Sequence, residues 1–209
     1  MIKLLIFGDS IAWGLFDLEK GGWVNRLTTY YINQFSDNTK TKVGVYNFAS
    51  STNNTRGVLN SLENSIKDVN FIKKDEMVLL FSIGLNDARY YDDKNNYLMT
   101  DKEFIKNINK LIKLSKKHSN KIFFTGLIKT NDELTKPWLD TEHWETADVK
   151  KFNDIIKKVC QEQKIEFIDI YSLLDNSDLY DGLHPNTQGQ IKIYNKIQKY
   201  LDTSLDLTK

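Results

Sequence analysis

Hydrophobic residues along the chain gather in five short runs that polar positions hardly interrupt. The runs cover residues 3–8, 42–48, 77–84, 121–127 and 165–170. Strands that are buried on both faces of a parallel sheet have this composition, whereas a strand with one solvent-facing side alternates apolar and polar residues. The pattern therefore predicts five strands of a parallel sheet.

Between and after these runs, apolar residues recur at helical spacing. The five stripes are Trp23, Leu27, Tyr30, Tyr31 and Phe35; Val58, Leu62, Ile66 and Val69; Phe104, Ile108, Leu111, Ile112 and Ser115; Phe152, Ile155, Ile156 and Val159; and, in a last helix over residues 187–201, Ile191, Tyr194, Ile197 and Leu201. Alternating strands and helices predict the α/β class, as a doubly wound three-layer α/β/α sandwich. No linker or repeat divides residues 1–209, so we expect one domain.

Composition and charge narrow the classes of function. Apolar residues make up 40% and charged residues 27%, as in a folded globular protein. The formal net charge is only +1, which provides no general attraction to nucleic acid or to an anionic membrane. Residues 4–7 are the only apolar run before the first glycine, too short for a signal peptide or a membrane span. We expect a cytoplasmic protein that neither binds nucleic acid nor inserts into a membrane.

Residues suited to catalysis follow the ends of the predicted strands. Ser10 comes directly after the first run, Asn86 follows the third, and Asp181 and His184 lie just before the last helix. Because the carboxyl ends of parallel strands meet at one edge of a sheet, we expect these residues to converge. A hydroxyl nucleophile, an imidazole base and a carboxylate that orients the base are the parts of an acyl-transfer site. The amide of Asn86 can stabilise an oxyanion.

Each of these residues also has a purely structural interpretation. Gly-Asp-Ser after a strand is an ordinary loop sequence, and Asn86-Asp87 can be a turn or a helix cap. Of the three histidines, His118 lies near a helix end and His143 in a loop, whereas His184 is the least suited to fill a core. No grouping has metal-ligand spacing and no Gly-rich phosphate loop is present, so neither a metal nor an organic cofactor is expected.

Two connections are longer than such a fold needs. They cover residues 85–100 and 129–146, and both follow strand ends, so both should lie at the ligand-binding edge. Their aromatic residues either form a floor for a sugar, line a short acyl pocket, or merely anchor each loop to the body. The candidates for substrate binding are Tyr90, Trp138 and Trp144, together with Asp9 beside the serine.

Taken together, three segments resemble conserved blocks of the SGNH hydrolases, also called GDSL-type esterases and lipases. Residues 8–11 (Gly-Asp-Ser-Ile) are similar to the first block, residues 84–87 (Gly-Leu-Asn-Asp) to the third and residues 181–186 (Asp-Gly-Leu-His-Pro-Asn) to the last. The resemblance implies a flavodoxin-like sandwich of five parallel strands that hydrolyses esters or thioesters. It also implies that Ser10 is the nucleophile, His184 the general base and Asp181 its partner, with the Ser10 N–H and the Asn86 side chain as oxyanion donors.

The second family block is where this chain departs from the pattern. In residues 45–56, Thr52 occupies the position of the family glycine whose N–H completes the oxyanion hole. Thr52 keeps an N–H, but a β-branched residue resists positive φ by roughly 1–2 kcal/mol or more. Either positive φ is not needed here, or the loop has another shape.

The leading hypothesis is a serine esterase that acts on a small-molecule acyl ester of short chain length, with acetyl on a carbohydrate as one candidate. Hydrolysis of lysophospholipids or thioesters at the same site is the alternative activity. The sequence is also compatible with a homo-oligomer. A non-catalytic ligand-binding module on the same scaffold is the rival from another class. A flavin or nucleotide binder rests on fold analogy alone.

Overall fold

Five parallel strands form the central sheet in the computed structural model, which describes residues 1–37, 40–69 and 75–207. The strands are β1 (Ile2–Gly8), β2 (Val43–Asn47), β3 (Glu76–Ser82), β5 (Lys121–Thr125) and β7 (Glu166–Ile168). Their order is β2-β1-β3-β5-β7, which is the flavodoxin-like order. Each strand coincides with one predicted run to within about two residues at either end, so the parallel sheet is confirmed.

The central strand β1 shows why the runs are continuous. All seven of its residues are buried, because helices cover both faces of the sheet. Lys3 is the one charged residue among them. Its Nζ donates to the carbonyl oxygen of Val69 over 2.7 Å and lies 3.4 Å from Asp75, which offsets the cost of burying the charge.

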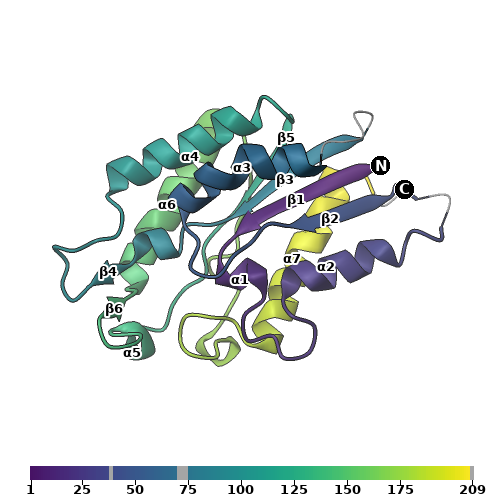
Figure 1. The fold of residues 1–209 in the computed structure, drawn as a ribbon. Helices are drawn as coiled ribbons and strands as arrows, with labels where there is room; N and C mark the ends of the chain where they lie inside the picture. Colours follow the sequence, from purple (N-terminus) through teal and green to yellow (C-terminus); the bar gives the residue numbers. More distant parts are fainter. Residues whose placement is uncertain (38–39, 70–74, 208–209) are drawn as a thin grey trace.

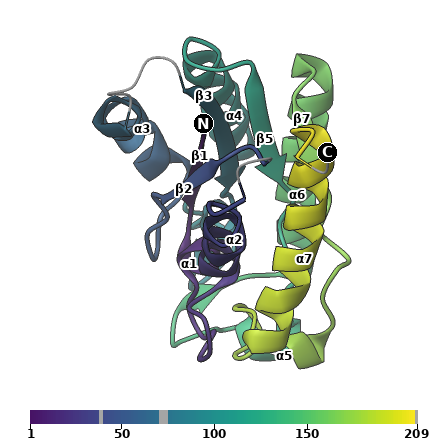
Figure 2. The same cartoon turned by 90° about the vertical axis from the view of Figure 1, so that its right-hand side faces the viewer.

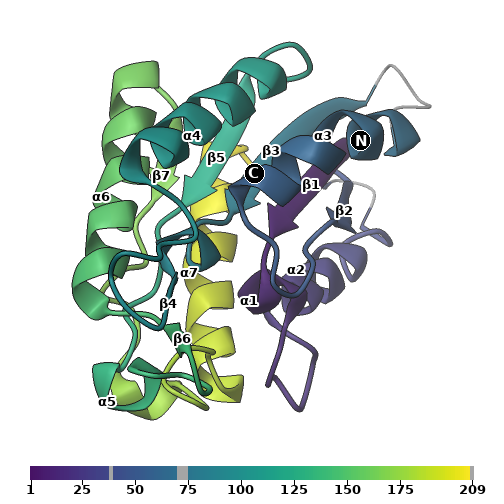
Figure 3. The same ribbon diagram turned by 60° about the vertical axis from the view of Figure 1, so that its left-hand side comes forward.

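Long helices cover the two faces of the sheet, as Figures 1 and 3 show. They are α2 (Trp23–Ile32), α3 (Thr55–Val69), α4 (Asp101–Ser115), α6 (Thr146–Gln163) and α7 (Thr187–Ser204). On one face α4 packs between α3 and α6, and on the other α2 packs against α7 (Figure 2). The three-layer α/β/α sandwich is thereby confirmed. No helix within the described ranges is both long and apolar enough to cross a bilayer.

Two of the predicted helix stripes were partly wrong. Helix α2 ends at Ile32, so Phe35 lies in the turn that follows and is 41% exposed. The buried face of α7 includes Ile193 and the polar residue Gln190, whereas Ile191 is only half-buried. Gln190 accepts a hydrogen bond from the Trp23 N–H and donates one to the carbonyl oxygen of Ile11. A pattern that counts only apolar residues cannot find such a buried polar position.

Short elements gather at the edge of the sheet toward which the strands point (Figure 3). They are α1 (Ser10–Trp13), a 3-10 turn η1 (Asn86–Ala88), β4 (Tyr90–Tyr91), α5 (Asp132–Thr135), β6 (Glu142–His143) and a second 3-10 turn η2 (Asn176–Asp178). Strands β4 and β6 pair antiparallel and thereby join the two long loops to each other. The predicted site residues all lie at this edge.

Candidate active site

Ser10 is held by the tight exit from β1 into α1. Asp9 caps α1 through its Oδ1, which accepts the Ile11 N–H over 3.0 Å. A Cβ at Gly8 would lie 2.5 Å from Cβ of Ala12 and 2.8 Å from the carbonyl oxygen of Ser82, so only glycine fits there. This turn places the Ser10 hydroxyl 2.9 Å from Nε2 of His184.

A single turn between η2 and α7 supplies both His184 and Asp181. Oδ1 of Asp181 accepts the backbone N–H groups of Leu183 and His184 over 3.0 and 2.8 Å. Its Oδ2 lies 2.8 Å from Nδ1 of the His184 ring. Gly182 has φ of +85°, a left-handed conformation that glycine adopts without strain. The spacing of Asp181 and His184 therefore lets one turn place base and carboxylate together.

The protonation of Asp181 determines which ring nitrogen of His184 can accept a proton. Burial alone would raise the pKa of Asp181, but the hydrogen bonds that its carboxylate accepts, first of all from the His184 side chain, outweigh burial and lower this pKa to about 2. An ionised carboxylate can only accept hydrogen bonds, so Nδ1 of His184 must donate to it. Nε2 of the neutral ring is then free to accept the Ser10 hydroxyl proton.

Thr52 and Asn86 face the same cavity as Ser10 and His184. Asn86 Nδ2 donates to the carbonyl oxygen of Asn53 over 2.8 Å, which fixes the amide and leaves its second hydrogen for another acceptor. In the part of the chain that the structure describes, the N–H groups of Ser10 and Thr52 donate to no other residue. Two backbone donors and one amide donor are thus available around the serine hydroxyl.

The conformation of Thr52 matches neither alternative that the sequence offered. Its φ is +63°, so the threonine adopts the left-handed region that a β-branched residue was expected to resist. The surrounding turn holds it: the Asn53 N–H donates to the Ser50 carbonyl oxygen, and Asn86 binds the Asn53 carbonyl. The loop keeps positive φ and does so with a strained residue.

The comparisons with known proteins agree with this geometry. The family model described as GDSL-like Lipase/Acylhydrolase matches residues 4–197, nearly the whole chain. The chain belongs to this family. It is therefore an ester-hydrolysing enzyme, and the resemblance seen in the sequence is confirmed. A search of curated proteins found no match for this GDSL hydrolase.

Solved structures show the same fold at low sequence identity. A lipase/acylhydrolase from Enterococcus faecalis is 18% identical with a TM-score of 0.73, covering 98% of this chain and 97% of that one. A psychrotrophic esterase from Pseudoalteromonas sp. is 18% identical with a TM-score of 0.72 and 98% of both chains covered. An acetyl xylan esterase from Geobacillus stearothermophilus is 16% identical with a TM-score of 0.71, covering 94% and 93%.

The cavity beside Ser10 in this GDSL hydrolase is small, at about 110 Å³. Two of the aromatic residues predicted to bind substrate, Trp138 and Trp144, line it. The indole N–H of Trp144 donates to the carbonyl oxygen of Leu85 over 3.0 Å, so this ring also anchors its loop. Trp144 therefore lines the cavity and also anchors its loop, and its contact with substrate stays a prediction.

Two other predicted substrate-binding residues do not line the cavity. Asp9 is only 3% exposed, and its carboxylate serves the turn by capping α1. Tyr90 is 5% exposed, and its ring stacks on His143 with 4.7 Å between centroids. The Tyr90 hydroxyl donates to Glu145 over 2.7 Å. Asp9 and Tyr90 do lie at the predicted edge of the sheet, but their side chains point into the protein and not into the cavity.

Sequence reasoning missed a charged pair in the cavity wall. Arg89 Nη1 donates to Glu142 over 2.7 Å, and both residues line the cavity of the GDSL hydrolase. The guanidinium lies over the ring of Trp144, 5.2 Å from its centroid. The two residues come from the two long loops, and only the pairing of β4 with β6 brings them together. The sequence indicated this pair only in that the two long loops, which follow strand ends at the same edge, contain residues of opposite charge.

Asp87 is a second residue whose structural role the sequence did not reveal. Its carboxylate accepts both the N–H and the hydroxyl of Thr55, at the start of α3. Burial raises the pKa of Asp87 to about 6. Asp87 thus ties the segment that carries Asn86 to the loop that carries Thr52, and fixes these two residues relative to each other.

Proposed function

We propose that this enzyme is a serine esterase that cleaves short-chain carboxylic esters through an acyl intermediate on Ser10. The observation that carries the proposal is the continuous chain of contacts from the Ser10 hydroxyl to His184 Nε2, at 2.9 Å, and from Nδ1 to Asp181, at 2.8 Å. A nucleophile, a base and an orienting carboxylate in this geometry are what acyl transfer requires.

In the proposed cycle, Ser10 Oγ attacks the ester carbonyl carbon while His184 Nε2 takes the hydroxyl proton. The oxyanion that forms accepts hydrogen bonds from the N–H groups of Ser10 and Thr52 and from the Asn86 amide. The imidazolium then donates its proton to the leaving alcohol, and an acyl group stays on Ser10. Water then attacks this acyl group while His184 Nε2 takes one of its protons, and the imidazolium returns that proton to Ser10 Oγ as the bond to the acyl group breaks and the acid leaves.

The size and polarity of the cavity support a short acyl group. A volume of about 110 Å³, bounded by two tryptophans and the Arg89–Glu142 pair, leaves little room for a long chain. An extended alkyl group would also have to lie against a partly buried charged pair, which is unfavourable. Among the related structures, one is an acetyl xylan esterase, and this adds support for acetyl on a carbohydrate as the small-molecule substrate.

Hydrolysis of a series of nitrophenyl esters tests the proposal. We expect the highest kcat/KM for acetate or propionate, a steep fall with longer chains, and loss of activity in Ser10→Ala. A maximum at long chains would contradict the short-chain assignment and favour lysophospholipids. A native protein that hydrolyses no ester of the series would favour the non-catalytic binding module.

A further inference from the structure

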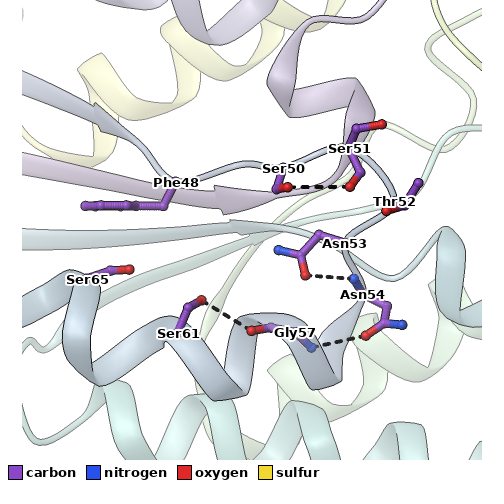
Figure 4. Close-up of a pocket in the computed structure, with 9 residues that line it drawn as sticks. All are labelled: Phe48, Ser50, Ser51, Thr52, Asn53, Asn54, Gly57, Ser61 and Ser65. Atoms are coloured by element: carbon purple, nitrogen blue, oxygen red, sulfur yellow. Dashed lines mark hydrogen bonds between the residues drawn. The ribbon is translucent and has the colours of Figure 1, made fainter.

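A second and larger hollow adjoins the catalytic cavity. This groove has a volume of about 510 Å³ and lies between the loop after β2 and the helix α3, as Figure 4 shows. Ser51 and Thr52 line both the groove and the cavity beside Ser10. A ligand in the groove would therefore reach the catalytic serine without a break in the surface.

The lining of this groove is rich in hydroxyl and amide groups. Along the loop side they come from residues 50–54, and on the helix side from Ser61 and Ser65 (Figure 4). None of the described residues that line the groove is charged. Hydroxyl and amide groups both donate and accept hydrogen bonds, so they match a ligand that carries many hydroxyl groups of its own.

Phe48 adds one aromatic surface to this polar lining. Its ring stacks on Phe7 with centroids 5.3 Å apart, which holds it in place at the rim of the sheet. Phe48 is half-buried and also lines the groove. A rigid aromatic ring beside hydroxyl groups offers an apolar surface for the C–H face of a sugar ring and polar partners for its edge.

Anionic ligands fit this groove poorly, although the N-terminus of α3 lies beside it. Two of the first three N–H groups of that helix already have acceptors: Thr55 N–H donates to Asp87, and Gly57 N–H donates to Asn54 Oδ1 over 3.1 Å. With no cation in the lining, a phosphate would lose its hydration without a compensating charge. The groove thus disfavours the headgroup of a lysophospholipid.

We infer that this groove binds the carbohydrate part of the substrate, an uncharged oligosaccharide that carries the acyl group to Ser10. The inference rests on the proposed function, because the groove is assigned to the same ester that the catalytic residues cleave. It assigns the small cavity to the reacting ester and the groove to the polyhydroxylated group beyond it.

The test fills the groove and compares two kinds of ester. Ser61 is exposed on α3 within the groove, so Ser61→Trp blocks it without disturbing the core. Asn60 is an exposed neighbour on the same helix outside the lining, so Asn60→Trp is the matched control. The substrates are acetylated xylo-, gluco- and manno-oligosaccharides on one side and nitrophenyl acetate on the other.

We expect Ser61→Trp to lower kcat/KM at least tenfold for the acetylated oligosaccharide that the native enzyme prefers, mainly through KM. Nitrophenyl acetate should be hydrolysed within twofold of the native rate, and Asn60→Trp should change neither. The groove assignment is wrong if the native protein cleaves nitrophenyl acetate through Ser10 but no sugar ester. It is also wrong if Ser61→Trp and Asn60→Trp have the same effect. Either result leaves the proposed esterase activity unaffected. If nitrophenyl acetate is not cleaved either, the proposed function itself fails.

Discussion

Trp138 donates its indole N–H to Oδ2 of Asp181 over 3.0 Å, the same carboxylate oxygen that meets Nδ1 of His184. The Trp138 ring also lies edge-on to the His184 ring, with 5.7 Å between centroids. Trp138, in the long loop after β5, thus contacts both the carboxylate and the imidazole and helps to fix their relative orientation. Trp138 is a positioning residue as well as a wall of the cavity.

Replacing Trp138 by phenylalanine should lower kcat for nitrophenyl acetate by roughly tenfold. The variant keeps a ring in the wall but loses the hydrogen bond that orients Asp181, and small misplacements of catalytic groups cost rate. Steady-state kinetics separate the effects, because a positioning role lowers kcat more than it raises KM. Trp13→Phe, at a tryptophan that is 51% exposed, is the control and should leave both parameters unchanged. A Trp138→Phe enzyme with native kcat would contradict this role.

Asp9 should make the stability of the fold depend on pH. Burial raises the pKa of Asp9 to about 7, well above that of an unfolded aspartate. From about pH 4 to about pH 7 the unfolded chain loses this proton before the folded chain does, so the folded state loses stability as pH rises through that window. The whole loss is present above about pH 7.

The variant Asp9→Asn resembles the protonated carboxyl at every pH and keeps an oxygen for the Ile11 N–H. We expect it to raise the free energy of unfolding by up to about 4 kcal/mol near pH 8 and to change little near pH 4, since the pKa is raised by about three units and each unit corresponds to about 1.4 kcal/mol. Denaturant unfolding at the two pH values measures the difference. An equal effect at both would show that the carboxyl is not protonated in the folded protein.

Thr52→Gly should stabilise the protein. Threonine in the left-handed region costs about 1–2 kcal/mol, whereas the extra freedom of glycine in the unfolded chain costs about 0.5–1 kcal/mol. The net gain is up to about 1.5 kcal/mol. The N–H that we propose as an oxyanion donor is retained, so the rate with nitrophenyl acetate should stay within about twofold. Ser51→Gly is the matched control, because Ser51 is not among the residues with positive φ, and it should lose stability. Thermal unfolding that ranks the two variants the other way would contradict the strain at Thr52.

Two of the arginine–glutamate pairs, Arg89–Glu142 and Arg56–Glu103, should contribute differently to stability. Arg89 and Glu142 have side chains that are 11% and 26% exposed, whereas Arg56 and Glu103 are 46% and 37% exposed at a similar distance. Glu142→Ala leaves a mostly buried guanidinium without its carboxylate and should lower the free energy of unfolding by about 2 kcal/mol. Glu103→Ala should cost less than about 1 kcal/mol. Denaturant titrations that give equal losses would refute the difference.

The sheet and the gathering of Ser10, Asp181 and His184 at one edge were predictable, because the strands and the motifs that carry these residues are local features of the sequence. Continuous apolar runs fix buried parallel strands, and strand ends place Ser10 and Asn86 at one edge whatever the details of packing. The Asp181–His184 spacing is also local, since one turn supplies both residues.

The remainder depended on contacts between segments far apart in the sequence. The buried Gln190 satisfies polar groups of α2 and of the segment after β1, and its burial follows from that contact. The pairing of Arg89 with Glu142 exists only because β4 meets β6. Positive φ at Thr52 opposes the local preference of threonine, and the surrounding turn imposes it.

The most direct test of the catalytic account is labelling with a fluorophosphonate, followed by peptide mapping in a mass spectrometer. The account predicts one adduct, on Ser10, in the native protein, no adduct in Ser10→Ala, and labelling slowed by at least a hundredfold in His184→Ala. Labelling that persists in Ser10→Ala, or a native protein whose Ser10 does not react, would contradict an activated serine at this site.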